Sequence, residues 1–136
     1  MTNAKTMGVH HVGLTTPDLD ATYGFFTGVL GFTEIGGVPD YPAKFVSDGT
    51  TLITLWQVKD MDGFVPFDRH RNAGLHHIAF RIEDHAALDD LFGALSTRPD
   101  VEIECDPSSI LEGSSARHFL CSIPGGIRVE FATPLS

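Results

Sequence analysis

Two adjacent histidines occur twice in the chain, as His10-His11 and His76-His77, and each pair precedes alternating apolar residues. Neutral imidazoles are common ligands of divalent transition metals. A carboxylate, Glu130, lies in an apolar segment near the C-terminus. Two imidazoles and one carboxylate form a recurrent site for Fe(II), Mn(II), Zn(II), Ni(II) or Co(II) and leave coordination positions open for substrate. These residue types predict a catalytic divalent metal ion, provided that the fold brings them together.

The histidine pairs belong to a longer internal repeat. Residues 8–26 match residues 74–92 at a constant offset of 66 residues, which aligns glycine, histidine, aspartate and phenylalanine positions. Residues 49–55 match residues 125–131 at an offset of 76, which aligns Thr54 with Glu130. Two such matches in the same order predict a duplicated structural module.

Each copy predicts the order strand-helix-strand-strand-strand, and the first helix is expected to follow Asp18 as its N-cap. The predicted fold class is α+β, with two tandem βαβββ modules that form one curved mixed sheet around a central metal cavity. One domain is expected over residues 1–136, with module one at about 8–58, a linker at about 59–73 and module two at about 74–134. The predicted strands are 9–16, 32–35, 43–47, 50–58, 75–82, 101–105, 117–122 and 127–132, and the second helix is 84–96.

Side chains alternate across a strand, so parity predicts which residues share a face. If the apolar residues of each first strand pack under the helix, His11 and His77 point to the opposite face. The same rule places Thr54 and Trp56 on that face in module one and Glu130 in module two. We therefore predict His11, His77 and Glu130 as metal ligands, with Thr54 and Trp56 in contact with substrate.

A further imidazole, His118, has the parity of the same face. An imidazole can orient a substrate or carry a proton, so His118 is predicted as a catalytic residue together with Glu130. His10 and His76 lie one residue before the predicted ligands and are expected on the helix side, in structural or exposed positions.

Composition excludes some classes of function. The chain has 136 residues and a formal net charge of −9, which argues against nucleic acid or an anionic membrane as a partner. No apolar run approaches the ~20 residues of a membrane span, and the N-terminus lacks the pattern of a secretion signal. Cys105 and Cys121 are expected to be reduced thiols in a cytoplasmic protein. A small-molecule substrate is the expected partner.

The pattern resembles the vicinal oxygen chelate superfamily, which includes glyoxalase I, bleomycin-resistance proteins, methylmalonyl-CoA epimerase, fosfomycin-resistance enzymes and extradiol dioxygenases. The resemblance covers about residues 9–134 and rests on segments 11–32, 77–84 and 124–131. It implies metal ligands at His11, His77 and Glu130 and a homodimer.

The fourth ligand position of the superfamily falls on Thr54, where glyoxalase I and the epimerases have Glu or Gln. That carboxylate is implicated in moving the substrate proton, so its absence weakens an assignment to glyoxalase I. Gln57 would substitute as a ligand only if a β-bulge reversed its parity. A glyoxalase I-like lyase or isomerase is the first choice. The alternatives are an extradiol Fe(II) dioxygenase and a non-catalytic binding protein like those of bleomycin resistance.

Overall fold

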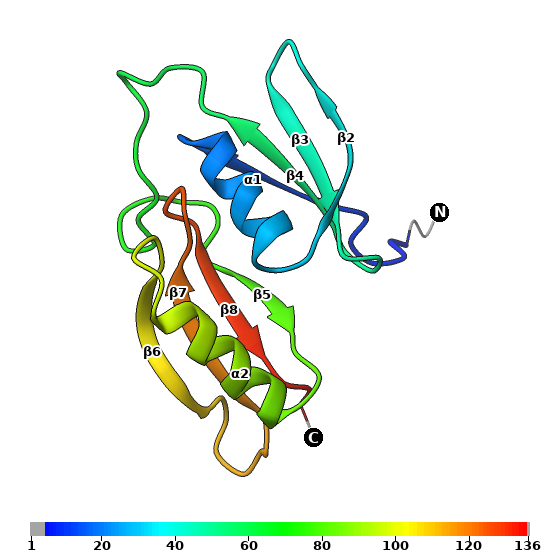
Figure 1. The fold of residues 1–136 in the computed structure, drawn as a ribbon, viewed down its shortest axis with the longest axis vertical. Helices are drawn as coiled ribbons and strands as arrows, with labels where there is room; N and C mark the ends of the chain where they lie inside the picture. The colour runs from blue at the N-terminus through cyan, green and yellow to red at the C-terminus, as the bar shows by residue number, and fades with distance from the viewer. Residues whose placement is uncertain (1–4, 136) are drawn as a thin grey trace. The chain divides into compact units, whose positions relative to one another are not determined.

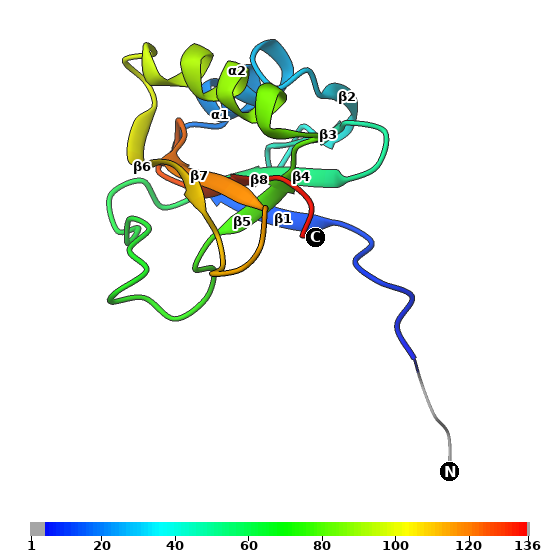
Figure 2. The same cartoon turned by 90° about the horizontal axis from the view of Figure 1, so that it is seen from below.

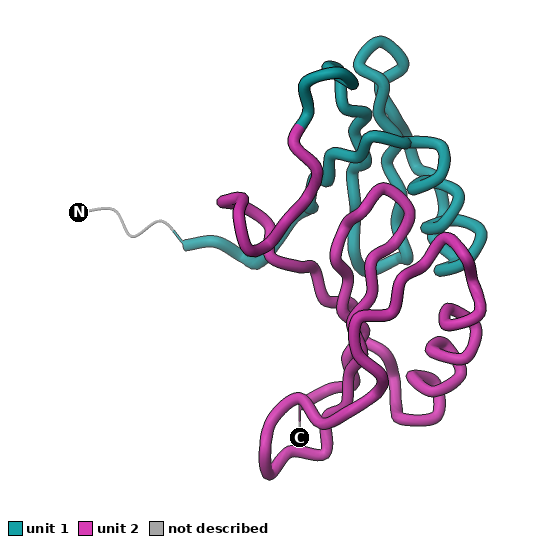
Figure 3. The backbone as a smooth tube through the Cα atoms, turned by 90° about the vertical axis from the view of Figure 1, so that its left-hand side faces the viewer, with its two compact units in different colours: residues 1–64 teal, residues 65–136 magenta. Residues whose placement is uncertain are grey.

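A computed structural model describes residues 5–135, and within this range no helix has the length and apolar character that crossing a membrane requires. The chain divides into two compact units, residues 1–64 and 65–136, which Figure 3 colours separately. The boundary between the units lies inside the predicted linker. Each unit contains one of the two predicted modules.

The described part of unit 1 forms a four-stranded sheet with one helix (Figure 1). The strand order is β1-β4-β3-β2, with β1 parallel to β4 and the other neighbours antiparallel. The helix α1 contacts β3 and β4. The elements are β1 (Val12–Thr16), α1 (Leu19–Gly28), β2 (Thr33–Val38), β3 (Ala43–Ser47) and β4 (Leu52–Gln57).

Unit 2 repeats this plan in its described residues. The strand order is β5-β8-β7-β6, and β5 runs parallel to β8. Figure 2 shows α2 along one face of this sheet, where it contacts β6 and β7. The elements are β5 (Ile78–Arg81), α2 (His85–Ser96), β6 (Glu102–Ser109), β7 (Arg117–Ser122) and β8 (Arg128–Ala132).

The α+β class and the two tandem βαβββ modules are confirmed. The strands form two four-stranded sheets, one in each unit, rather than one continuous sheet, because each first strand pairs with the last strand of its own module. The largest differences from the predicted strand starts are at β1, which begins at Val12, and β5, which begins at Ile78, three residues later than expected in each case. Both histidine pairs therefore precede a strand instead of lying within it.

The two helices begin in the same way. The Asp18 carboxylate accepts a hydrogen bond from the backbone N–H of Ala21 at 3.1 Å, and Asp84 accepts one from Ala87 at 2.9 Å. Both contacts satisfy backbone donors that the first turn of a helix leaves without partners. The predicted N-cap at Asp18 is confirmed, and Asp84 repeats it in the second module.

The core of unit 2 lies between its sheet and α2. Phe119 on β7 and Phe131 on β8 are at most 1% exposed, and their ring centroids are 5.2 Å apart. Leu88 and Leu95 of α2 belong to the same core and have no measurable exposure of their own. Since side chains alternate along a strand, burial of these phenylalanines directs their neighbours on β7 and β8 to the opposite face. That face carries the predicted chemistry.

Candidate functional site

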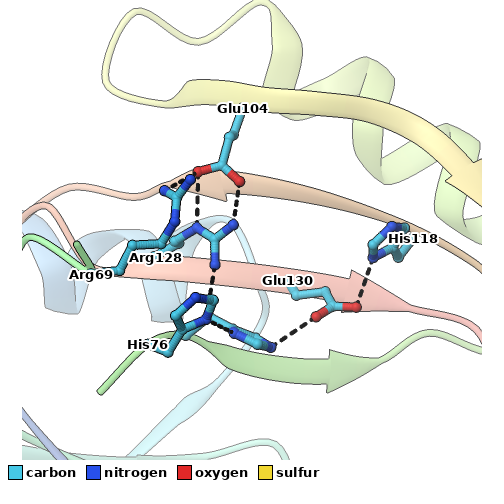
Figure 4. A network of polar contacts seen from close by, with 7 residues as sticks. Arg69, His76, Glu104, His118, Arg128 and Glu130 are labelled. Atoms are coloured by element: carbon cyan, nitrogen blue, oxygen red, sulfur yellow. Dashed lines mark hydrogen bonds and ion pairs between the residues drawn. The ribbon is translucent and has the colours of Figure 1, made fainter. Parts of the chain in front are cut away.

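Glu130 is the centre of a cluster on the helix-free face of unit 2. Its Oε1 lies 3.0 Å from Nε2 of His77, and its Oε2 lies 2.8 Å from Nδ1 of His118 (Figure 4). Glu130 reaches this position because β8 lies between β5 and β7. Its side chain is only 13% exposed, so the carboxylate depends on these two imidazoles for much of its solvation. The structure thus brings together three of the predicted site residues.

The spacing of His77 and Glu130 suits two ligands of one metal ion. Two ligand atoms about 2.1 Å from a metal and at right angles to each other lie about 3 Å apart. The 3.0 Å between His77 Nε2 and Glu130 Oε1 agrees with that value. His118 contacts the other carboxylate oxygen, the usual place of a residue that orients a ligand.

A third ligand must be supplied from outside this pair. Among residues 5–135, no three His, Cys, Asp or Glu side chains are grouped so that they could hold a metal ion. The predicted third ligand, His11, belongs to unit 1. Its Nδ1 lies 2.9 Å from Nδ1 of His10, which leaves its Nε2 as the ring atom for a ligand. That His11 binds the same metal stays a prediction.

Thr54 and Trp56 form a second group of site residues, in unit 1. The indole Nε1 of Trp56 donates a hydrogen bond to Thr54 Oγ1 at 2.9 Å. The neighbouring Gly13 permits this contact, since a Cβ there would lie 3.1 Å from Thr54 Oγ1. Tyr41 and Phe45 pack against Trp56 with ring centroids 4.6 and 5.9 Å away. The result is an aromatic surface beside the buried Thr54 hydroxyl, with the Tyr41 hydroxyl as a second polar group. Contact with substrate stays a prediction.

Gln57 secures the start of α1 and does not take the role of a fourth ligand. Its Oε1 accepts a hydrogen bond from the backbone N–H of Leu19, and its Nε2 donates to the carbonyl of Pro17, both at 2.9 Å. The pairing of β1 with β4 continues in register to Gln57 without a bulge. Nothing therefore reverses the parity of this side chain.

Sequence reasoning missed a charged network beside the histidine pair of unit 2. Arg128 binds Glu104 with two guanidinium nitrogens, Nε to Oε1 at 2.9 Å and Nη2 to Oε2. Its third nitrogen, Nη1, lies 3.2 Å from Nδ1 of His76 (Figure 4). Arg69 adds a second cation, with Nη1 at 2.7 Å from Glu104 Oε1. The sequence contains one signal for this network. Arg128 precedes Glu130 by two residues in the same strand, so alternation places both side chains on one face.

His76 itself is not placed on the helix side as expected. Because β5 begins only at Ile78, strand alternation does not extend back to His76, and its ring turns toward Arg128. Desolvation, followed by the charges of Arg128 and His77, lowers the pKa of His76 below 6.5. The hydrogen bond from Arg128 is the first cause that lowers the pKa of Glu104, and Arg69 contributes as well.

A pocket of about 260 Å³ borders this charged network. One wall is the loop at residues 67–70, and the other is formed by strand residues that include Glu104 and Arg128. Arg128 thus lines this pocket and also contacts His76 of the histidine pair.

Comparisons with known proteins agree with the fold and the residue pattern. The sequence profile of the Glyoxalase/Bleomycin resistance protein/Dioxygenase superfamily matches residues 8–131. A 2-epi-5-epi-valiolone epimerase of an Actinomyces species is 30% identical over 147 residues, which cover 94% of this chain and 74% of that protein. A glyoxylase/bleomycin resistance protein/dioxygenase domain from Frankia sp. EAN1pec has a TM-score of 0.76 at 26% identity, covering 95% and 93% of the two chains. Lactoylglutathione lyase from Agrobacterium tumefaciens has a TM-score of 0.69 at 24% identity, covering 96% of each.

Proposed function

Because the chain belongs to the Glyoxalase/Bleomycin resistance protein/Dioxygenase superfamily, we propose that it is a divalent-metal-dependent enzyme that moves a proton on a small substrate. The reaction is an isomerisation or epimerisation, or a related lyase reaction, at a carbon next to a carbonyl. The observation that carries the proposal is the Glu130 carboxylate, which shares its two oxygens between His77 and His118. The similarity to an epimerase supports this reaction class.

The proposed metal ligands are His11, His77 and Glu130. Two imidazoles and one carboxylate suit Fe, Mn, Zn, Ni or Co in the divalent state and leave positions for two substrate oxygens. A bound divalent ion supplies Lewis acidity, which draws electrons from a chelated carbonyl and makes the neighbouring C–H bond more acidic.

His118 is the proposed proton acceptor. An ionised carboxylate only accepts hydrogen bonds, so Nδ1 of His118 carries the hydrogen in its 2.8 Å contact with Glu130. In a neutral ring Nε2 then keeps a lone pair, which can take the proton when the substrate C–H bond breaks and its electrons move into the carbonyl. Such a role compensates for Thr54, which has no carboxylate to do this work.

The aromatic surface of unit 1 is the proposed substrate wall. Trp56 and Tyr41 present ring faces and edges for the carbon skeleton, and the Thr54 hydroxyl is a polar group beside them. This combination favours a small molecule that carries vicinal oxygens on an apolar frame. The proposal includes a homodimer as the assembled form and no nucleic-acid or membrane partner.

Exchange of substrate hydrogen with solvent tests this function even when the product is unidentified. The metal-loaded protein is incubated in D2O with a panel of α-hydroxy ketones and 1,2-dicarbonyl compounds, and loss of the C–H signal is followed by proton NMR. We expect exchange on at least one compound, only with metal present. His118→Gln should lower the rate by about 10²- to 10⁴-fold when the protein is saturated with metal.

His85→Gln is the matched control, since His85 is an imidazole of unit 2 that bonds the backbone carbonyl of Ser115 instead. Equal loss of exchange in both variants would remove His118 from the reaction. Oxygen uptake on catechols by the Fe(II) form would replace the isomerase proposal with the dioxygenase alternative. Metal-independent binding without exchange or oxygen uptake would identify a binding protein.

A further inference from the structure

Arg128 determines where the hydrogen lies on the ring of His76. A guanidinium group has five N–H donors and no acceptor, and it stays protonated in proteins. Its Nη1 lies 3.2 Å from Nδ1 of His76, so in this contact the imidazole nitrogen must accept. His76 therefore carries its hydrogen on Nε2 and a lone pair on Nδ1.

The same constraint passes from His76 to His77. Their Nδ1 atoms are 2.8 Å apart, and a hydrogen bond at that distance needs one donor and one acceptor. The single lone pair on Nδ1 of His76 is then shared between the Arg128 and His77 contacts. A second lone pair at 2.8 Å would be repulsive, so Nδ1 of His77 must carry the hydrogen. The other ring nitrogen of His77, Nε2, faces Glu130 Oε1 at 3.0 Å. A lone pair directed at a carboxylate oxygen is repulsive, so this gap is suited to a cation, either a proton or a metal ion.

We propose that Arg128 and His76 form a relay that holds His77 with its hydrogen on Nδ1, the tautomer that can bind a metal through Nε2. This inference rests on the proposed metal-binding function and adds two positioning residues to it. Neither residue touches the metal in this scheme. Each acts through the hydrogen bonds that fix the next ring, as outer-shell partners of histidine ligands commonly do.

Arg128 is held firmly enough to serve this role. Two of its nitrogens are bound to the two oxygens of Glu104, which orients the guanidinium plane and directs Nη1 toward His76. Its side chain is only 11% exposed. Arg69 binds the same carboxylate from the loop before β5 and so restrains Glu104 as well.

Module one provides an internal comparison. His10 and His11 repeat the contact between Nδ1 atoms, at 2.9 Å, with ring centroids 5.1 Å apart. The residue that matches Arg128 in the repeat is Leu52, which has no hydrogen-bond donor in its side chain. The relay is therefore a property of the second histidine pair, and changes to Arg128 should leave the tautomer of His11 unaffected.

Nitrogen NMR of the histidine rings tests the relay directly. Uniformly ¹⁵N-labelled protein is studied at pH 8.5 by long-range ¹H–¹⁵N correlation, both metal-free and with one equivalent of Zn²⁺. We expect hydrogen on Nδ1 of His77 and on Nε2 of His76. In Arg128→Leu and in His76→Phe, His77 should shift toward the Nε2–H form, and zinc affinity should fall about 10- to 100-fold in competition with a chromophoric chelator.

Arg98→Leu is the control for loss of a positive charge, because Arg98 pairs with Asp100 in the turn after α2 and is outside the network. It should change neither the His77 signals nor zinc affinity. If the Arg128→Leu protein does not fold, the His76→Phe protein tests the relay instead, because His76 is exposed and its replacement should not prevent folding. The relay would be overturned if Nδ1 of His77 carries no hydrogen in the wild-type protein. It would also be overturned if both variants keep the hydrogen on Nδ1 of His77 and the wild-type zinc affinity. Correct tautomers in a protein that binds no zinc would instead overturn the proposed metal function and leave the relay intact.

Discussion

Thr54 and Glu130 occupy the same position in two copies of one module. Thr54 is paired with Gly13 on the parallel strand β1, and Glu130 is paired in the same way with Ala79 on β5. The two modules thus share backbone geometry at this position and differ in chemistry, with a hydroxyl in one and a carboxylate in the other. We therefore expect the carboxylate of Glu130, and not the hydroxyl of Thr54, to bind metal.

Thr54→Ala should leave zinc affinity within about twofold of wild type. The hydroxyl oxygen already accepts the Trp56 indole N–H, and an aliphatic hydroxyl is a poor ligand beside imidazole and carboxylate. Loss of that hydrogen bond should destabilise the protein by about 1 kcal/mol and change the emission of Trp56, the single tryptophan. Chelator competition and fluorescence measure both effects. A tenfold fall in affinity would make Thr54 a ligand after all.

Gly13→Ala should disturb the contact between Thr54 and Trp56. The added Cβ would lie 3.1 Å from Thr54 Oγ1 and 3.5 Å from Trp56 Nε1, so one of these side chains must move. We expect a loss of about 1–3 kcal/mol in the free energy of unfolding, measured with urea, and a shift in tryptophan emission. Ala79→Gly is the matched change in module two, where a glycine should cost about 0.5–1 kcal/mol without altering emission. If Gly13→Ala leaves the free energy of unfolding unchanged, Thr54 and Trp56 have room for the added Cβ.

Asp84→Ala should lower the free energy of unfolding by about 1 kcal/mol, because the carboxylate caps α2 through the N–H of Ala87. Asp90→Ala, a change of the same type at an exposed position inside α2, should be neutral or slightly stabilising, since alanine is the better helix former. Urea unfolding of both variants checks the contrast. Equal effects would argue against a capping role for Asp84.

Glu104 should make stability depend on acid pH. Its pKa is lowered from the ordinary value of 4.5, chiefly by the hydrogen bond from Arg128, so the folded state favours the ionised form. The resulting stability is fully present above pH 4.5 and is lost as the pH falls through the lower folded-state pKa. The difference in unfolding free energy between wild type and Glu104→Gln should therefore shrink between about pH 5 and pH 3.

Glu102→Gln, two residues away on β6, is the control for removing a carboxylate from the same strand. Urea midpoints measured across the same pH range provide the comparison. A Glu104→Gln difference that stays constant down to pH 3 would show that the ion pair with Arg128 does not stabilise the fold.

The repeat allowed much of this site to be predicted from sequence. The offset that aligned Thr54 with Glu130 is confirmed by their matching registers, and parity correctly placed His118 beside Glu130. The role of Gln57 could not be predicted, since its partners are Pro17 before α1 and Leu19 at the start of that helix.

For the network around Arg128, parity indicates only that Arg128 shares a face with Glu130 and does not predict its partners. Glu104 and Arg128 lie on β6 and β8, which are separated by β7, so their contact depends on long side chains that span a strand. The register of β6 shifts twice along β7, which further obscures parity there. The position of His76 could not be predicted from alternation either, because His76 lies two residues before the first residue of β5.

Zinc binding by His77→Ala and Glu130→Ala, compared with His85→Ala, tests the proposed metal site most directly. The measurement is the stoichiometry and affinity of Zn²⁺ for each purified protein after metal removal, by chelator competition. We predict one ion per wild-type chain, a loss of at least about 100-fold in affinity for the first two variants and no change for His85→Ala. A wild-type protein that binds no zinc, or a His77→Ala protein that binds it as tightly as wild type, would contradict the proposed site.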